Sequence, residues 1–277
     1  MLPLTMRHQE FKVPNELQGT IKCFWHNSNN FGTSPTTFEV MPDGYAEIIF
    51  YFGELYSLTS SGYMQPLPSP FMMGLLNKPA HFYTQNQLQI IGIRCFPWTV
   101  FDLLGLPPGK DSLRVFEHPI AGLQPQLNTC MQAGNIAGAI NIVTQFFTNA
   151  VTEPASGNML YKAGDAMIMA RGTRPVSRIA AEAHATVRTL ERNFKRSSGH
   201  TVKDVSALMR FEQVRNHLWI YPDASLAGLA HELGYTDQAH LSREFKRYSG
   251  TTPAAFARKA KQGKPLNGDD FVAFVQA

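Results

Sequence analysis

The sequence lacks the long apolar run that a membrane-spanning helix requires. Hydrophobic residues make up 44% of the 277 residues, but no uninterrupted stretch approaches the roughly 18 apolar residues of a transmembrane helix. The N-terminus also lacks the apolar core of about 7–15 residues that a secretory signal contains. These two absences favour a soluble protein that is not exported.

Cysteine is scarce, and metal-binding patterns are missing. The three cysteines are far apart and form no C-x-x-C pair, which predicts reduced thiols in a cytosolic protein. The histidines of the N-terminal half are isolated, with no H-x-H or H-x-x-E pattern on a strand. We therefore expect no metal, no cofactor and no catalytic residues, and an inert buried thiol at Cys95 rather than a redox sensor. The residues concerned are Cys23, Cys95, Cys130, His8, His26, His81 and His118.

The net charge of +4 averages over two unlike parts of the chain. Residues 1–170 contain 8 Lys and Arg against 11 Asp and Glu, a net charge of −3, whereas residues 171–262 contain 16 against 8, a net charge of +8. Residues 263–277 contribute −1. This asymmetry predicts a polyanionic partner for the second part only, with an inert solvated basic face as the alternative.

The first part has the pattern of a small β-rich domain. Residues 46–52 and 88–96 are rich in aromatic and β-branched side chains, and prolines and glycines separate the apolar runs. There is no room for alternating strands and helices. The pattern predicts an antiparallel barrel or sandwich.

A helical periodicity follows over residues 126–151, and Gly134-Asn135 divides it into two helices. One face has an apolar seam that approximates a heptad repeat. The seam can pack within the subunit or against a second copy, and we predict that it forms a homodimer. Its residues are Ile136, Ile140, Val143 and Phe147.

Residues 225–258 have the pattern of two helices joined by a tight turn. Ser225 can cap the first helix, Gly234 can end it, and Thr236 or Asp237 can cap the second. The second helix ends at Gly250 and buries Leu241 and Phe245, which leaves its polar side chains free. This is the layout of a helix-turn-helix, whose second helix reads base edges in the major groove.

A second copy of the pattern lies upstream. The motif L-x-R-x-F-K-R-x-x-G occurs at residues 190–199 and again at residues 241–250, an offset of 51 residues. Residues 202–220 have the periodicity of a helix that connects the two copies. Two recognition helices on one rigid spacer can reach successive major grooves, about 34 Å apart.

Over residues 175–260 the chain resembles the AraC/XylS family of bacterial transcription regulators. The resemblance rests on a nearly complete family signature in the second copy, whereas the first copy departs from it at His184, where glycine is more usual, and at Thr201-Val202, where Ser-Pro is common. The N-terminal half looks like the cupin-like sensor domains of one branch of the family. The signature residues are Ala230, Leu233-Gly234-Tyr235, Asp237-Gln238, His240-Leu241-Ser242-Arg243, Phe245-Lys246, Gly250, Thr252-Pro253, Phe256 and Arg258.

Glutamine suits adenine and arginine suits guanine, and lysine and arginine in the last turn suit phosphates. On this basis we predict that one set of residues contacts bases or phosphates of the DNA and that another set contacts only its phosphates. The first set is Arg188, Glu191, Arg192, Gln238, Ala239, His240, Ser242 and Arg243, and the second is Lys195, Arg196, Lys246 and Arg247.

We also predict a site for a small effector in the N-terminal domain, where Arg94 would admit an anionic ligand. The predicted lining residues are Tyr45, Tyr83, Arg94, Phe96 and Trp98.

The sequence thus predicts an α+β protein with two domains. Residues 1–152 form a cupin-like sensing and dimerising domain, with the β-structure up to about residue 120 and helices after it, and residues 153–175 form a linker. Residues 176–262 form the DNA-binding domain, and residues 263–277 form a tail. We expect a cytoplasmic activator that binds promoter DNA, RNA polymerase and a second copy of itself. The alternatives are a cupin-type enzyme with a DNA-binding appendage and a ligand-independent repressor.

Overall fold

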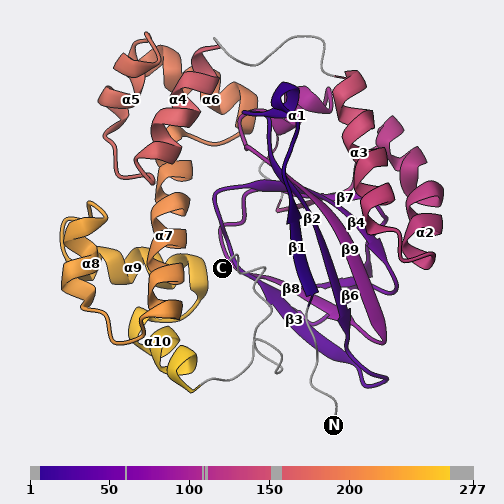
Figure 1. The fold of residues 1–277 in the computed structure, drawn as a ribbon. Coiled ribbons are helices and arrows are strands. Elements are labelled where there is room, and N and C mark those ends of the chain that lie inside the picture. Colours follow the sequence, from indigo (N-terminus) through magenta and orange to yellow (C-terminus); the bar gives the residue numbers. More distant parts are fainter. Residues whose placement is uncertain (1–6, 60, 108, 110–111, 151–157, 263–277) are drawn as a thin grey trace. The chain divides into compact units, whose positions relative to one another are not determined.

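A computed structural model describes residues 7–59, 61–107, 109, 112–150 and 158–262, and the chain forms two compact units (Figure 1). Unit 1 comprises residues 1–37, 45–74 and 81–156, and unit 2 comprises residues 38–44, 75–80 and 157–277. The predicted tail and part of the predicted linker lie outside the described residues. Among the described helices, none has the length and apolar character needed to cross a lipid bilayer.

The N-terminal part of the chain forms two antiparallel sheets. The larger sheet has the strand order β1-β2-β9-β4-β7-β10, and the smaller has the order β3-β8-β5-β6. Of the predicted alternatives, a barrel or a sandwich, the structure has the sandwich. Two predicted strands match β4 and β9 to within one residue. The strands are β1 (Arg7–Phe11), β2 (Ile21–Asn30), β3 (Thr36–Val40), β4 (Ala46–Phe52), β5 (Tyr56–Leu58), β6 (Met64–Pro66), β7 (Phe71–Met73), β8 (Ala80–Thr84), β9 (Gln87–Cys95) and β10 (Leu113–Arg114).

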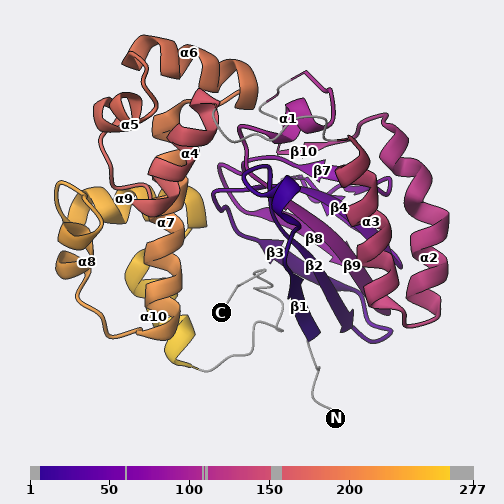
Figure 2. The same ribbon diagram turned by 45° about the horizontal axis from the view of Figure 1, so that its top comes forward.

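Two helices, α2 (Gln124–Gln132) and α3 (Ile136–Ala150), lie along one face of the larger sheet (Figure 2). The short helix α1 (Val100–Leu103) precedes them. As predicted, the helical segment is divided at Gly134-Asn135. The ring of Phe147 on α3 stacks at 6.5 Å from Phe24 on β2, which places this face of α3 in the core of unit 1.

The predicted dimer seam is therefore wrong for these residues. Ile140, Val143 and Phe147 are buried in the apolar core of unit 1, and Ile136 packs against that core. The larger sheet covers the apolar seam within one chain, which is the alternative that the sequence pattern left open. The seam is not available to a second copy in the folded protein.

Unit 2 contains the helices α4 to α10. The predicted connecting helix is α7, with the predicted bounds, but the predicted linker is not a loose segment, because it contains the 11-residue helix α4. Asn158 caps α4 by accepting a hydrogen bond from the Leu160 amide at 3.0 Å, and Ala163, Ala166 and Met167 of α4 are buried. The helices are α4 (Met159–Met169), α5 (Val176–Glu182), α6 (Val187–Ser198), α7 (Val202–Ile220), α8 (Leu226–Glu232), α9 (Gln238–Ser249) and α10 (Pro253–Lys261).

Candidate nucleic-acid interface

Two helix-turn-helix units lie within unit 2. The first consists of α5 and α6, and the second consists of α8 and α9. Their recognition helices are α6 and α9. Both recognition helices have 12 residues, and their first and last residues are offset by 51. The same core positions are buried in each, Leu190 and Phe194 in α6 and Leu241 and Phe245 in α9. Each helix also ends at a glycine in the left-handed region, Gly199 or Gly250.

Side-chain caps fix where the second unit begins and turns. Ser225 accepts a hydrogen bond from the Gly228 amide at 3.2 Å at the start of α8. Asp237, not Thr236, caps α9, because its carboxylate accepts from the His240 amide at 2.6 Å. These caps set the angle at which the chain enters the recognition helix.

The outward faces of both recognition helices carry most of the predicted contact residues. On α6 and α9 the basic residues among them are all exposed, and three other predicted contacts are half-buried. The exposed residues are Arg188, Arg192, Lys195, Arg196, Gln238, Ala239, Arg243, Lys246 and Arg247, and the half-buried residues are Glu191, His240 and Ser242.

Two of the half-buried residues are engaged within the fold. One carboxylate oxygen of Glu191 accepts a hydrogen bond from the Val202 amide at 3.2 Å, at the start of α7. The His240 ring packs edge-on against Tyr235 at 5.3 Å, and its Nδ1 lies 3.4 Å from Thr236 Oγ1. Both side chains thus brace local structure.

The two units differ in the turn before the recognition helix. The first helices, α5 and α8, are offset by 50 residues, whereas the recognition helices are offset by 51, so the second turn is one residue longer. His184 and Gly234 occupy the matching left-handed positions, with φ of 53° and 69°. The glycine usual in the family is thus replaced in the first unit by a residue that still adopts its conformation.

One exposed residue on the recognition helices escaped the sequence prediction. Val187 is the first residue of α6, is 44% exposed and matches Gln238 at the start of α9. The 51-residue offset could have identified Val187, because it aligns Val187 with Gln238, which the sequence predicts to contact a base.

The predicted effector site of the N-terminal domain is only partly assembled. The Arg94 guanidinium lies 4.9 Å from the Tyr45 ring, Tyr45 packs at 5.9 Å on Phe96, and Phe96 stacks at 5.2 Å on Trp98. The ring contact of Tyr83, by contrast, is with Tyr56 at 5.8 Å. Four of the five predicted residues are therefore linked in one chain of contacts.

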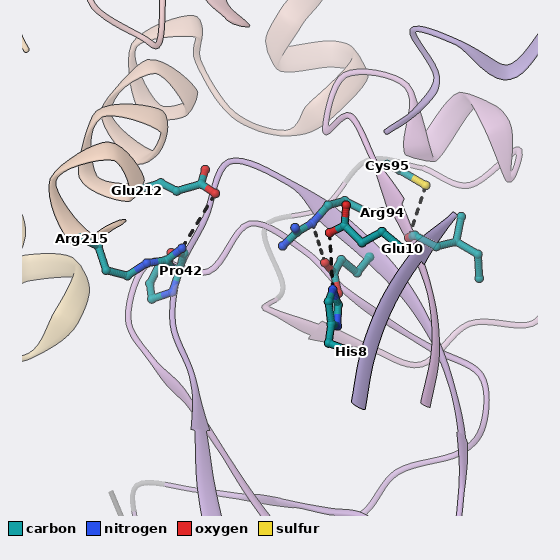
Figure 3. Close-up of polar contacts among 9 residues, drawn as sticks. His8, Glu10, Pro42, Arg94, Cys95, Glu212 and Arg215 are labelled. Carbon is teal, nitrogen blue, oxygen red and sulfur yellow. Dashed lines mark hydrogen bonds and ion pairs between the residues drawn. The ribbon is translucent and has the colours of Figure 1, made fainter. Parts of the chain in front are cut away.

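Arg94 is already neutralised within the protein. Its Nε donates to Glu47 Oε1 at 2.8 Å, and both side chains are less than 5% exposed (Figure 3). His8 and Glu10 form a nearby pair, with 3.4 Å between His8 Nε2 and Glu10 Oε1. The prediction that Arg94 admits an anion does not allow for this carboxylate, with which an anionic ligand would have to compete.

The two buried thiols of this region are unreactive in character. Burial, and then the charge of Glu10, raises the pKa of Cys23 to about 12. Burial also raises the pKa of Cys95, whose Sγ lies 3.7 Å from the Ile93 carbonyl oxygen (Figure 3). Because thiolate is the reactive form, this agrees with an inert role for Cys95. Among the described residues, no three His, Cys, Asp or Glu side chains gather as a metal site would require.

Comparison with known families supports the assignment of unit 2 as a DNA-binding domain. Residues 179–259 match the AraC-type family model described as a helix-turn-helix domain, the region that contains both units. The chain thus contains an AraC-type DNA-binding domain of transcription regulators. The matched domain belongs to a family of transcription factors and not of enzymes. Residues 9–111 match a second model, described as a domain of unknown function (DUF6597).

Several solved structures are similar to this chain. ToxT from Vibrio cholerae O395 is 12% identical, with a TM-score of 0.45 over 85% of this chain and 97% of that one. The DNA-binding domain of AdpA, solved with a target DNA, is 24% identical, with a TM-score of 0.36 over 40% and 98%. The AraC-like activator CuxR is 10% identical, with a TM-score of 0.34 over 73% and 92%. These scores are too low to support a functional conclusion. No curated protein matches the chain.

Proposed function

We propose that the protein activates transcription by placing α6 and α9 in two successive major grooves of a promoter. The observation that carries this proposal is the matched exposure of Arg192 and Arg243, which stand at the same position of the two recognition helices. Each arginine can bind a guanine in bidentate fashion, while the basic last turns contact phosphates.

The experiment begins with selection of bound sites from a random duplex library by the full-length protein. Affinity for the selected site is then measured for Arg192→Ala and Arg243→Ala, with Lys195→Ala and Lys246→Ala as matched variants on the same helices. We expect each arginine variant to relax the preference at one base position, in a different half of the site. Loss of affinity without loss of preference for both arginine variants would contradict the assignment.

The N-terminal sandwich is proposed to sense a small molecule. The contacts among Tyr45, Arg94, Phe96 and Trp98 support a ligand site with aromatic walls, and the Glu47 carboxylate favours an uncharged or cationic effector over an anion. The test is a screen of candidate effectors for a change in operator affinity of the full-length protein. A protein whose DNA binding responds to no effector and that represses transcription would match the ligand-independent alternative.

A homodimer remains part of the proposal, with its interface moved away from the apolar seam. On α3, Asn141 and Gln145 are exposed and face away from the core that buries Val143. Sedimentation of the wild type tests the dimer, and Asn141→Arg tests this face without disturbing the core. A wild type that is monomeric at micromolar concentration would exclude the dimer.

Activation implies a contact with RNA polymerase, and work on chromosomal promoters implies a cytoplasmic location. Transcription in vitro with purified polymerase and the selected site upstream of a promoter tests the sign of regulation. We expect more transcript when the protein is added. A decrease would make the protein a repressor.

A further inference from the structure

The side chain of Arg210, in the middle of α7, contacts three separate segments of unit 2. Its Nη1 donates to the Gly172 carbonyl at 3.0 Å, in the connection between α4 and α5. Its Nη2 donates to the Glu244 carboxylate on α9, at 3.3 Å to Oε2 and 3.5 Å to Oε1. The guanidinium carbon also lies 5.2 Å from the ring centroid of Tyr235, in the turn before α9.

This cluster is largely shielded from solvent. The side chains of Arg210 and Glu244 are 16% and 12% exposed, and Tyr235 is 6% exposed. Burial, followed by the neighbouring Glu244 carboxylate, raises the pKa of the Tyr235 phenol, so its hydroxyl keeps its proton. Charges in such a position are weakly screened, and removal of one partner leaves the other without its counter-charge.

The backbone around the cluster is closely fitted. Gly172 has a φ of 73°, and a Cβ at this position would lie 2.3 Å from the Ser206 carbonyl oxygen of α7. A Cβ on Gly234, in the turn before α9, would lie 3.7 Å from the Thr173 Cβ. The α4–α5 connection therefore packs tightly against the long helix α7, and a side-chain atom on Gly234 would bring it into contact with the turn before α9.

The first unit has no matching arrangement at the equivalent positions. The residue that matches Glu244 is Asn193, whose side-chain amide donates to the Thr189 carbonyl of its own helix at 2.9 Å. The residue that matches Tyr235 is Ala185, because each amide donates to the matching carbonyl at 2.9 Å, Ala185 to Ala180 and Tyr235 to Ala230. Alanine has no ring to pack against a guanidinium. The cluster is thus a property of the second recognition helix only.

We propose that Arg210 is a positioning residue that fixes the recognition helix α9 to the α4–α5 connection through Gly172 and Glu244. The connection precedes the first helix-turn-helix unit in sequence but is bonded to the recognition helix of the second. Loss of the Arg210 contacts would then alter base reading by α9 and leave reading by α6 intact. The inference rests on the proposed base contacts of Arg243.

The test uses the full-length protein and the DNA site selected by the wild type. Arg210→Ala and Glu244→Gln are compared with Arg174→Ala, which removes a more exposed ion pair between the α4–α5 connection and Glu182 on α5. Protection of the DNA backbone is mapped separately on the two halves of the site. We expect Arg210→Ala and Glu244→Gln to lose protection of the α9 half, with specific affinity reduced about tenfold, while Arg174→Ala matches the wild type.

Double-mutant cycles separate positioning from a general loss of structure. Arg210→Ala combined with Arg243→Ala should cost less than the sum of the two, because the Arg243 contact is already impaired, whereas Arg210→Ala with Arg192→Ala should be additive. Circular dichroism and thermal melting check the fold. If Arg210→Ala is unfolded, Glu244→Gln and Tyr235→Phe, which preserve shape, undergo the same footprinting and cycles.

Two outcomes would overturn the proposal. One is an equal loss of protection in both half-sites, and the other is additivity of the position 210 and 243 variants. If Arg243→Ala itself left base preference unchanged, the proposed base contacts would fail, and that result is distinct from a failure of Arg210 alone.

Discussion

The two helix-turn-helix units share their helices but not the way in which those helices are held. In both, a serine near the end of the recognition helix binds back to the carbonyl four residues earlier, Ser198 to Phe194 at 2.8 Å and Ser249 to Phe245 at 2.7 Å. In the second unit the turn is longer by one residue, and Tyr235 contacts Arg210 and His240. Local sequence therefore builds the same helix twice, while contacts distant in sequence distinguish the second copy.

The largest expected effect comes from the shared core. Phe245 is buried, with ring contacts at 5.1 Å to Phe211 and 5.4 Å to Phe256. Phe245→Ala should lower the free energy of unfolding by about 3–5 kcal/mol, because it leaves a cavity among these rings. Urea denaturation measures the loss, with Phe194→Ala as the matched variant in the first unit. If the two helix-turn-helix units unfold independently, Phe245→Ala or Phe194→Ala alone will produce two unfolding transitions in urea instead of one.

The next effect concerns base reading by the two arginines. Arg192→Ala and Arg243→Ala should each cost about 1–3 kcal/mol of specific binding. Among the described residues, only the second helix-turn-helix unit contacts Arg210 through its recognition helix. We therefore expect the loss of binding free energy in Arg243→Ala, and not in Arg192→Ala, to depend on Arg210. Titration against specific and random DNA gives both values. Lys246→Ala is the control, since a lost phosphate contact weakens both DNAs and lowers the salt slope by about 0.9.

A smaller effect separates Glu191 on α6 from Ser242, the residue at the matching position on α9. Glu191→Gln should destabilise the protein by about 1 kcal/mol, because the carboxylate accepts from the Val202 amide at the positive end of α7. Ser242→Ala at the matching position should change stability by less than about 0.5 kcal/mol. Thermal melting compares them, and equal losses would remove the distinction between the two positions.

The smallest effect tests the first residue of each recognition helix. Val187 is apolar and exposed, so it suits the methyl group of a thymine, whereas Gln238 suits an adenine. Replacement of the contacted thymine by uracil removes one methyl and should weaken wild-type binding about fourfold, the value of about 0.8 kcal/mol for one buried methylene. Val187→Ser should abolish the difference between thymine and uracil, and Arg192→Ala should preserve it. A Val187→Ser protein that still distinguishes the two bases would refute the assignment.

Much of the fold follows from local sequence, although helix α4 in the predicted linker was missed, and the failure at the α3 seam is a matter of tertiary contact. Ser225, Gly234 and Gly250 take the capping and terminating roles predicted for them, since caps depend on a few neighbouring residues. The face of α3 was assigned to a second copy because periodicity reveals an apolar face but not what covers it. The contacts of Arg210 with Gly172 and Glu244 join residues 38 and 34 positions away, and a single sequence has no signal for such pairs.

The longer turn at Tyr235 also sets where the domain can be recombined to change its operator. Exchange of residues 187–198 with residues 238–249 transplants one 12-residue recognition helix onto the other at the shared offset of 51. Exchange of whole helix-turn-helix units would instead move Tyr235 away from Arg210 and leave a one-residue mismatch in the loop. For redesign of DNA specificity, the recognition helix can thus be exchanged by itself, whereas the turn before it has to stay with the rest of the domain.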